Sequence, residues 1–346
     1  MYFREDEIII LLGAGCSAEA GILTSVQMIE AIEQLIEGDW KDYKELYHYI
    51  KSSIFYAEGI GGKFGEVNFN IERLVNVLSE LEEKEEYTIY PFVGNWNIKL
   101  IELAGFDFKK IKNFKNKIME RLKKWVTKDD YTDAGYYSKF VDFHKQYQSH
   151  LRIFTLNYDL CLEKNGGDVN IERGFDENRK WDWRRFDFNT NNPVDIFLYK
   201  MHGSIDWKRN NNGELTYSDD TSRVDNPDLI FGTNYKLQYI DPYLFSAYEF
   251  RKYSLEAKLI ITIGYGFGDE HINSILNQAL KSDSQRKLLC VGIGITAEKI
   301  NKALSYKDNE QIKVSTKNAK DYLQNDFEIG KLEKLYPQDS DSKIFG

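Results

Sequence analysis

The feature that most constrains the fold is an apolar run at residues 8–12, Ile-Ile-Ile-Leu-Leu, which Gly13 and Gly15 follow at once. Five consecutive apolar residues predict a strand that is buried on both faces, as in a parallel sheet. Glycine lets the backbone turn sharply and approach another group closely, because it has no Cβ. The stretch therefore predicts the first strand and the first turn of an α/β fold.

The turn after this strand has residues that suit an anion. Ser17 is a candidate N-cap for a helix that we expect to include Ile22 and Val26. A glycine turn that leads into a helix N-terminus favours a pyrophosphate, because the amide N–H groups and the helix dipole both attract anions. The third glycine is Gly21, so the spacing differs from the G-x-G-x-x-G of dehydrogenases. The alternative is a tight turn whose glycines serve only packing.

Length and charge limit the classes of protein to which the chain can belong. It has 346 residues, 42% of them hydrophobic, which suffices for one large domain with an insertion or for two domains. The net charge of −9 argues against coating nucleic acid by bulk electrostatics, so we expect no direct nucleic-acid binding. There is no basic, then apolar, signal-like N-terminus, and no apolar run approaches about 20 residues. We therefore expect a cytoplasmic protein with no membrane span.

Cysteine and histidine spacing does not indicate a metal centre. Cys16, Cys161 and Cys290 are far apart and form no C-x-x-C pair, so we expect neither a disulfide framework nor a zinc site. Four histidines have no metal-ligand spacing with another His or Cys: His48, His144, His150 and His271.

Helical periodicity dominates residues 37–150. Apolar residues at helical spacing from Ile71 to Leu81 and from Ile111 to Trp125 predict two helices. The second helix is rich in lysine, which indicates a solvated face or a face that contacts a partner or phosphate. We expect a helical insertion subdomain at 37–150, a core formed by 1–36 and 151–330, and a C-terminal tail at 331–346.

Five further apolar runs predict strands, and each ends in glycine or in polar residues: 151–156, 196–201, 229–231, 258–263 and 287–291. In an open parallel sheet, ligands bind outside the carboxyl ends of the strands. We therefore predict a Rossmann-like parallel sheet with helices on both faces. One edge of this sheet would carry Gly13, Asn157, His202 and Gly264.

Two irregular segments interrupt the predicted strands. Residues 172–193 are rich in charged and aromatic side chains and are interpreted as a lid or an interface loop. Residues 206–227 contain an Asn-Asn-Asn-Gly turn and predict a polar hairpin.

Four polar side chains at this edge are candidates for chemistry. His202 suits proton transfer because imidazole titrates near neutrality, although a lone histidine is often structural. The amide of Asn157 can orient a water or a ribose hydroxyl, or cap the next helix. Asp159 and Asp269 also precede predicted helices, where capping alone would explain them. The other role open to Asp269 is to hold a ribose hydroxyl.

Four segments occur in the order found in sirtuins, and they resemble more closely the SIR2-like domains of bacterial anti-phage defence proteins, such as the Sir2 subunit of Sir2–HerA-type systems. The segments are 13–22 (GAGCSAEAGI), 155–159 (TLNYD), 201–207 (MHGSIDW) and 264–269 (GYGFGD). The resemblance covers the sheet core, about two thirds of the chain.

The resemblance implies NAD+ as substrate and a role for each segment. Gly13, Ala14, Gly15 and Ser17 would hold the NAD+ phosphates. Asn157, with Asp159, would position the attacking water and the ribose, and His202 would be the catalytic residue. Gly264, Gly268 and Asp269 would bind the adenosine-side ribose.

Two departures from sirtuins argue against protein deacylation. Leu23-Thr24-Ser25 replaces the proline, phenylalanine and arginine that gate acyl substrates, and the four-cysteine zinc module is missing. The resemblance therefore favours an NAD+ glycohydrolase that releases nicotinamide and ADP-ribose, without zinc. We expect a homo-oligomer gated by self-assembly or by a partner such as a HerA-like ATPase or a short Argonaute. The alternative is a non-catalytic sensor of NAD or ADP-ribose.

Overall fold

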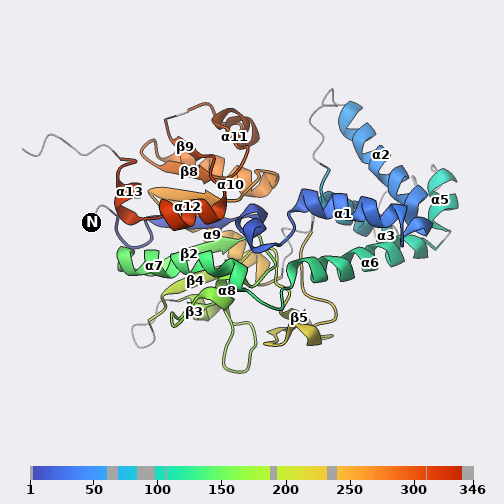
Figure 1. The fold of residues 1–346 in the computed structure, drawn as a ribbon, viewed down its shortest axis with the longest axis horizontal. Coiled ribbons are helices and arrows are strands. Elements are labelled where there is room, and N and C mark those ends of the chain that lie inside the picture. Colours follow the sequence, from blue (N-terminus) through green and yellow to red (C-terminus); the bar gives the residue numbers. More distant parts are fainter. Residues whose placement is uncertain are drawn as a thin grey trace, which may run out of the picture. The chain divides into compact units, whose positions relative to one another are not determined.

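The computed structural model describes residues 3–60, 69–83, 98–105, 107–187, 193–231, 240–308 and 310–336. The chain divides into two compact units. The sheet unit comprises Met1–Ile22, Asp129–Asp228 and Gln238–Gly346, and the helical unit comprises Leu23–Lys128 and Leu229–Leu237. Figure 1 shows the sheet strands in the first unit and a group of helices in the second.

Seven parallel strands form the sheet, in the order β3-β4-β2-β1-β7-β8-β9. Their bounds are β1 (Ile8–Leu12), β2 (Leu151–Thr155), β3 (Ile171–Glu172), β4 (Ile196–Lys200), β7 (Leu259–Ile263), β8 (Lys287–Val291) and β9 (Ile312–Ser315). Without β3, this is the doubly wound order in which the direction of chain progression reverses between β1 and β7. The predicted Rossmann-like fold class is confirmed.

The strand register aligns the carboxyl ends of the central strands. Leu12 pairs with Thr155 on one side and with Ile263 on the other. Thr155 pairs in turn with Lys200, and Ile263 with Val291. The loops that follow these strands therefore all begin at one edge of the sheet.

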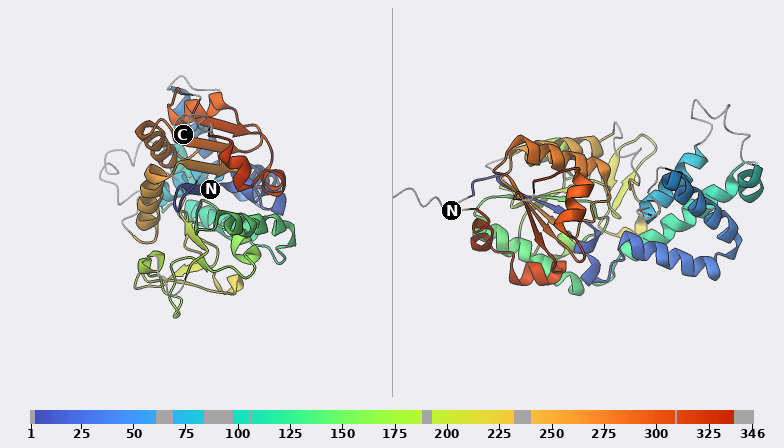
Figure 2. Two further views of the ribbon diagram at one scale, coloured as in Figure 1. Left: turned by 90° about the vertical axis from the view of Figure 1, so that its left-hand side faces the viewer. Right: turned by 90° about the horizontal axis from the view of Figure 1, so that it is seen from above.

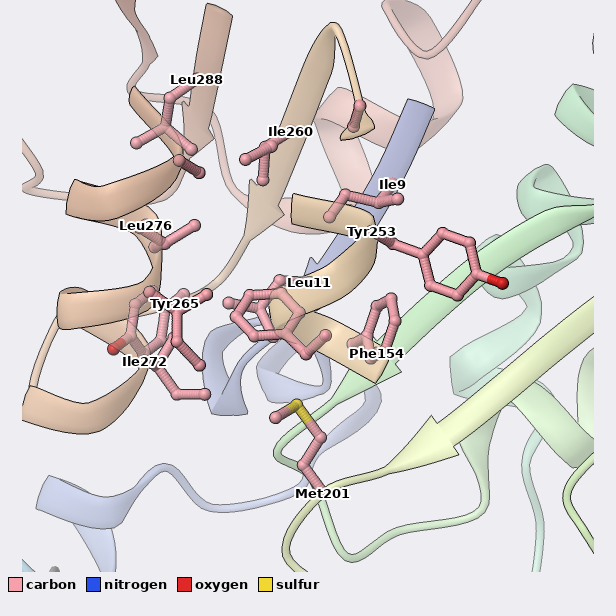
Figure 3. Close-up of a cluster of buried hydrophobic side chains, with 14 of the residues drawn as sticks. Ile9, Leu11, Phe154, Met201, Tyr253, Ile260, Tyr265, Ile272, Leu276 and Leu288 are labelled. Atoms are coloured by element: carbon pink, nitrogen blue, oxygen red, sulfur yellow. The ribbon is translucent and has the colours of Figure 1, made fainter. Parts of the chain in front are cut away.

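Helices lie on both faces of the sheet (Figure 2). They are α7 (Ser138–Tyr147), α8 (Cys161–Asn165), α9 (Tyr243–Glu256), α10 (Glu270–Ser282), α11 (Ala297–Leu304), α12 (Ala319–Asn325) and α13 (Ile329–Glu333). On one face, Ile9 and Leu11 of β1 join a core cluster with Tyr253 of α9 and Leu276 of α10 (Figure 3). Because alternate strand residues point to opposite faces, the full burial of β1, β2, β4 and β7 follows from this double cover.

The helical unit contains α1 (Ser25–Glu37), η3 (Lys41–Tyr43), α2 (Lys44–Ile60), α3 (Ile71–Glu82), α5 (Ile98–Ala104) and α6 (Lys109–Val126). The two helices predicted from apolar spacing are α3 and α6, and they pack against each other. Lys112 and Lys115 of α6 also form ion pairs with Glu82 of α3.

The two units divide at residues other than the expected bounds of 37 and 150. Helix α1 contacts α2, α3 and α6, so it belongs to the helical unit. The short helix η5 (Thr132–Tyr137) and helix α7 belong to the sheet unit, where η5 contacts α8 and α12.

Three strand assignments differ from prediction. Residues 229–231, predicted as a strand, form none of the sheet strands, and the glycine that follows them lies outside the described residues. Strands β3 and β9 were not predicted, because β3 has two residues and Ile-Lys-Val-Ser of β9 is only partly apolar. The predicted polar hairpin is confirmed as β5 (Trp207–Arg209) and β6 (Leu215–Tyr217).

Within the part of the chain that the structure describes, no helix combines the length and the apolar character needed to cross a membrane.

Candidate functional site

The loops that follow β1 and β7 pack backbone against backbone. The amide of Gly13 donates to Ile263 O at 3.0 Å, and that of Gly15 donates to Gly264 O at 2.9 Å. A Cβ on Gly13 would lie 2.6 Å from Gly264 O, and a Cβ on Gly264 would overlap the amide of Cys16. Gly264 also has φ +67°, which favours glycine. Packing between the two loops therefore accounts for the glycines at positions 13 and 264.

The prediction that Ser17 caps a long helix is wrong. The chain forms two short 3₁₀ helices, η1 (Ala14–Cys16) and η2 (Ala18–Ala20), and the side chain of Ser17 caps neither. Gly21, at φ +80°, ends η2. Helix α1 begins only at Ser25, where Thr24 forms a capping box with Gln27. No long helix N-terminus directly follows the glycine turn.

Ser17 is instead the centre of a buried polar network. Its hydroxyl donates to Asp159 Oδ2 at 2.7 Å and accepts from Asn157 Nδ2 at 3.1 Å. The same Nδ2 donates to Gly13 O at 3.0 Å, and the hydroxyl of Tyr137 lies 2.7 Å from Ser17 Oγ. The network joins the loop after β1 to the loop after β2.

Asp159 also contacts the start of the next helix, but it is not the N-cap of that helix, which is Leu160. Asp159 Oδ1 accepts from the amide of Cys161 at 2.9 Å, at the start of α8. Asn157 does not cap α8, because its side-chain amide group points to Gly13 and Ser17. Both of its Nδ2 hydrogens are used there, which leaves Oδ1 as the atom available to a ligand.

His202 and Asp269 form a second pair, which joins the loop after β4 to the start of α10. Their Nε2 and Oδ2 atoms lie 3.3 Å apart, and their side chains are only 4% and 5% exposed. Asp269 Oδ1 accepts from the amides of His271 and Ile272, so this carboxylate caps α10. His202 Nδ1 is buried and has no hydrogen-bond partner among the described residues.

The remaining predicted residues lie on the loops that follow β1 and β7. Ala14 and Gly15 are partly exposed between the buried Gly13 and Cys16. Gly268 is exposed, just before the buried Asp269. The edge that was predicted to collect Gly13, Asn157, His202 and Gly264 therefore does so, because their strands are parallel and in register.

A buried charge network beside this edge was missed. The ammonium of Lys200, at the end of β4, donates to the carbonyl of Asp159 and to Glu163 Oε1, the latter at 3.0 Å. Arg173 lies 3.5 Å from the same Glu163 oxygen and 2.8 Å from Asp206 Oδ2. The one sequence signal was a lysine directly after four strand residues that are otherwise apolar or aromatic, Ile-Phe-Leu-Tyr.

Neighbouring positive charges determine the ionisation state of the Asp206 carboxyl group in this network. Burial raises its pKa, but the positive charges of Arg173 and Lys200 outweigh burial, so the pKa lies below its usual value. Asp206 therefore stays a carboxylate although it is almost completely buried.

Among the described residues, one group of side chains has metal-ligand proximity: Glu5, Asp6 and His150. Arg152 Nε donates to Asp6 Oδ1 at 2.7 Å, so a fixed cation already occupies this carboxylate. Cys16, Cys161 and Cys290 are buried and free. The contact between Arg152 and Asp6 gives the cluster of Glu5, Asp6 and His150 a structural explanation.

Comparison with known protein families finds similarity over part of the chain. Residues 151–314 match the sequence profile of a SIR2-like domain. This range runs from β2 into β9 and contains Asn157, Asp159, His202 and Asp269. No curated relative matches the sequence.

Two solved structures show similarity at low sequence identity. One is a Sir2 homologue in complex with NAD, with 11% identity, a TM-score of 0.48, and coverage of 95% of this chain and 90% of that chain. The other is a mutant Sir2 homologue in complex with 2'-O-acetyl ADP ribose, with 12% identity, a TM-score of 0.44, and coverage of 96% and 94%.

Proposed function

We propose that this chain is an NAD+ glycohydrolase that cleaves the bond between nicotinamide and ribose. The observation that carries the proposal is the state of His202 within the SIR2-like domain. One imidazole nitrogen faces the carboxylate of Asp269, and the other is buried without a protein partner among the described residues. A histidine that faces a carboxylate with one nitrogen and leaves the other unbonded has the hydrogen-bonding pattern that a general base requires.

NAD+ would bind across the carboxyl edge of the sheet, where the direction of chain progression reverses between β1 and β7. Ala14 and Gly15 are the partly exposed residues of the first loop, so their backbone would approach the pyrophosphate. Gly13 and Ser17 are buried and would shape that loop. Gly264, Gly268 and Asp269 would lie on the ribose side.

Cleavage of the glycosidic bond develops positive charge on the ribose, and a water must then attack the same carbon. His202 would accept a proton from that water or from a ribose hydroxyl. Asn157 Oδ1 would orient the water, because its Nδ2 hydrogens are already bonded to Gly13 and Ser17. Asp159 would support Asn157 through the hydroxyl of Ser17, which both side chains contact.

An NAD+ hydrolase needs control, so we extend the proposal to a gated effector of anti-phage defence that depletes NAD+. The gate would be self-assembly into a homo-oligomer, or a partner such as a HerA-like ATPase or a short Argonaute. Trp183, from the charged and aromatic segment predicted as a lid or an interface loop, offers a contact surface. Its side chain is 49% exposed, and it lines a cleft of about 590 Å³ together with Trp181 and Ile240. Light scattering after size exclusion tests this extension, which a monomer that is fully active alone would overturn.

A sensor without catalysis is the second candidate. The observation in its favour is that His202 is almost fully buried beside Asp269, as a structural histidine would be. Such a protein would bind NAD or ADP-ribose and release no nicotinamide.

Turnover of NAD+ by the purified chain separates the two candidates. Nicotinamide and ADP-ribose are followed by chromatography for the wild type, for His202→Ala, and for His48→Ala as an exposed control in the helical unit. We expect His202→Ala to lower turnover by about 100-fold or more and His48→Ala to match the wild type. Full activity of His202→Ala would overturn the base, and NAD+ binding without product would favour the sensor.

A further inference from the structure

Two adjacent tyrosines of η5 contact the loop that follows β1. The hydroxyl of Tyr136 donates to Cys16 O at 2.6 Å, and the hydroxyl of Tyr137 lies 2.7 Å from Ser17 Oγ. The tyrosines are 3% and 1% exposed. Their partners, Cys16 and Ser17, are also consecutive residues. Tyr136 contacts the main chain of Cys16, and Tyr137 contacts the side chain of Ser17.

The donor in the hydrogen bond between Tyr137 and Ser17 follows from the number of hydroxyl hydrogens on Ser17. Ser17 has one hydroxyl hydrogen, which it donates to Asp159. Tyr137 must therefore donate to Ser17. Burial raises the pKa of both tyrosine hydroxyls, which keeps them protonated and able to donate.

The amides of Gly13 and Gly15 tie the first part of the loop to Ile263 and Gly264, but the regular structure within the loop is limited to short turns. Its local bonds are turns, Cys16 N to Gly13 O at 2.8 Å and Ser17 N to Ala14 O at 3.2 Å. Short 3₁₀ helices have poorer hydrogen-bond geometry than α-helices and depend on packing. Contacts of η5 and α12 with the loop supply this packing.

We propose that Tyr136 and Tyr137 are positioning residues that hold residues 13–17 in the shape that the site requires. Tyr137 acts on Ser17, which also contacts Asn157 and Asp159. Tyr136 fixes the main chain one residue earlier, at Cys16. Neither tyrosine lies in the four segments that resemble sirtuins, so no site role was assigned to them from sequence.

The consequence for ligand binding rests on the proposed function. Removal of either hydroxyl would let the loop sample other shapes, so the apparent affinity for NAD+ falls in proportion to the lost population. The base and its partner, His202 and Asp269, keep their contacts. Tyr136 bonds to the main chain of Cys16 and not to the Ser17–Asn157 pair, so in Tyr136→Phe kcat changes less than KM. A general loss of stability would not produce this split.

The experiment compares Tyr136→Phe and Tyr137→Phe with Tyr147→Phe. Tyr147 is a matched control, because it is 2% exposed in the same unit and its hydroxyl donates to the carbonyl of Arg4, away from the loop. Hydrogen exchange by mass spectrometry follows the peptide that spans residues 13–22. We expect exchange there to rise about three- to tenfold in the first two variants and to stay unchanged in Tyr147→Phe.

A second readout measures the dissociation constant of NAD+ by calorimetry and, where turnover is observed, KM and kcat. Unchanged exchange at residues 13–22 in Tyr136→Phe and Tyr137→Phe, or an equal rise in Tyr147→Phe, would overturn the positioning role. Faster exchange with a wild-type dissociation constant would overturn its importance for NAD+. If the wild type does not bind NAD+ but the exchange pattern holds, the proposed function fails and the positioning role stands.

Discussion

His202 Nε2 and Asp269 Oδ2 lie 3.3 Å apart, although the two residues come from different strand–loop units. Asp269 cannot move freely, because its other oxygen accepts from amides at the start of α10. A fixed carboxylate favours the imidazole tautomer with hydrogen on Nε2. Nδ1 is then the nitrogen that can accept a proton.

Replacement of this carboxylate separates an orienting role of Asp269 from ribose binding. Asp269→Asn keeps the oxygen that caps α10, but it removes the charge and lets the amide donate to the imidazole. We expect kcat for NAD+ cleavage to fall about 10- to 100-fold with little change in KM. Asp220→Asn, which alters another helix-capping carboxylate, should leave both constants unchanged. An increase in KM alone would support ribose binding instead.

Gly264 should tolerate no side chain. Its φ of +67° strains any other residue, and a Cβ would overlap the backbone of the opposite loop. We expect Gly264→Ala to lower the free energy of unfolding by about 3 kcal/mol or more, measured by urea denaturation. Gly266→Ala is the control, because among the described residues, its own chain neighbours aside, no atom lies within 4 Å of the position that its methyl group would take, and its expected change is within about 0.5 kcal/mol. Equal stability of the two variants would contradict the packing argument.

Lys200 should matter more for stability than an exposed lysine. Its side chain is 1% exposed and neutralises Glu163, which is 12% exposed. Lys200→Met leaves that carboxylate with Arg173 as its nearest cation at 3.5 Å, and we expect a loss of about 3 kcal/mol in urea denaturation. Lys180→Met, at an exposed pair with Glu214, should cost about 1 kcal/mol or less.

A double variant tests whether the loss comes from the uncompensated carboxylate. Lys200→Met with Glu163→Gln should be more stable than the sum of the two single losses predicts. Strict additivity would show that Lys200 and Glu163 act independently.

The pH dependence of stability should report on Asp206. Because its folded-state pKa is below the unfolded value, its contribution is present above about pH 4 and is lost as pH falls through the folded pKa. We expect Asp206→Asn to be less stable than the wild type at pH 7, and the difference to narrow at about pH 3. Asp219→Asn, at an exposed pair, should differ little from the wild type at either pH. A gap that widens on acidification would contradict the stated sign.

The sequence predicted the edge of the sheet better than its outer strands. Buried parallel strands give apolar runs, and the polar residues that end those runs mark the carboxyl edge. This logic located Asn157 and His202 correctly at that edge. It missed β9, which is only partly apolar, and it wrongly assigned a strand to residues 229–231.

Side-chain contacts between distant segments could not be read from the chain. The helix predicted after Ser17 is replaced by one short 3₁₀ helix, η2, because Gly21 ends η2 and the Thr24 cap delays the start of α1. Ser17 is then available to Tyr137, which comes from a segment that carried no motif. The partners of Ser17 depend on tertiary approach, for which hydrophobic spacing contains no signal.

The contact between the two glycine loops has a consequence for inheritance. A side chain at Gly13 or at Gly264 would overlap the backbone of the opposite loop. The two loops should therefore be inherited together. Recombination that imports the loop after β1 without the loop after β7 should yield chains that do not fold, whereas joint exchange preserves the interlock. Natural variation should therefore accumulate at open positions such as Gly266, whereas residues 13 and 264 should both stay glycine across descendants.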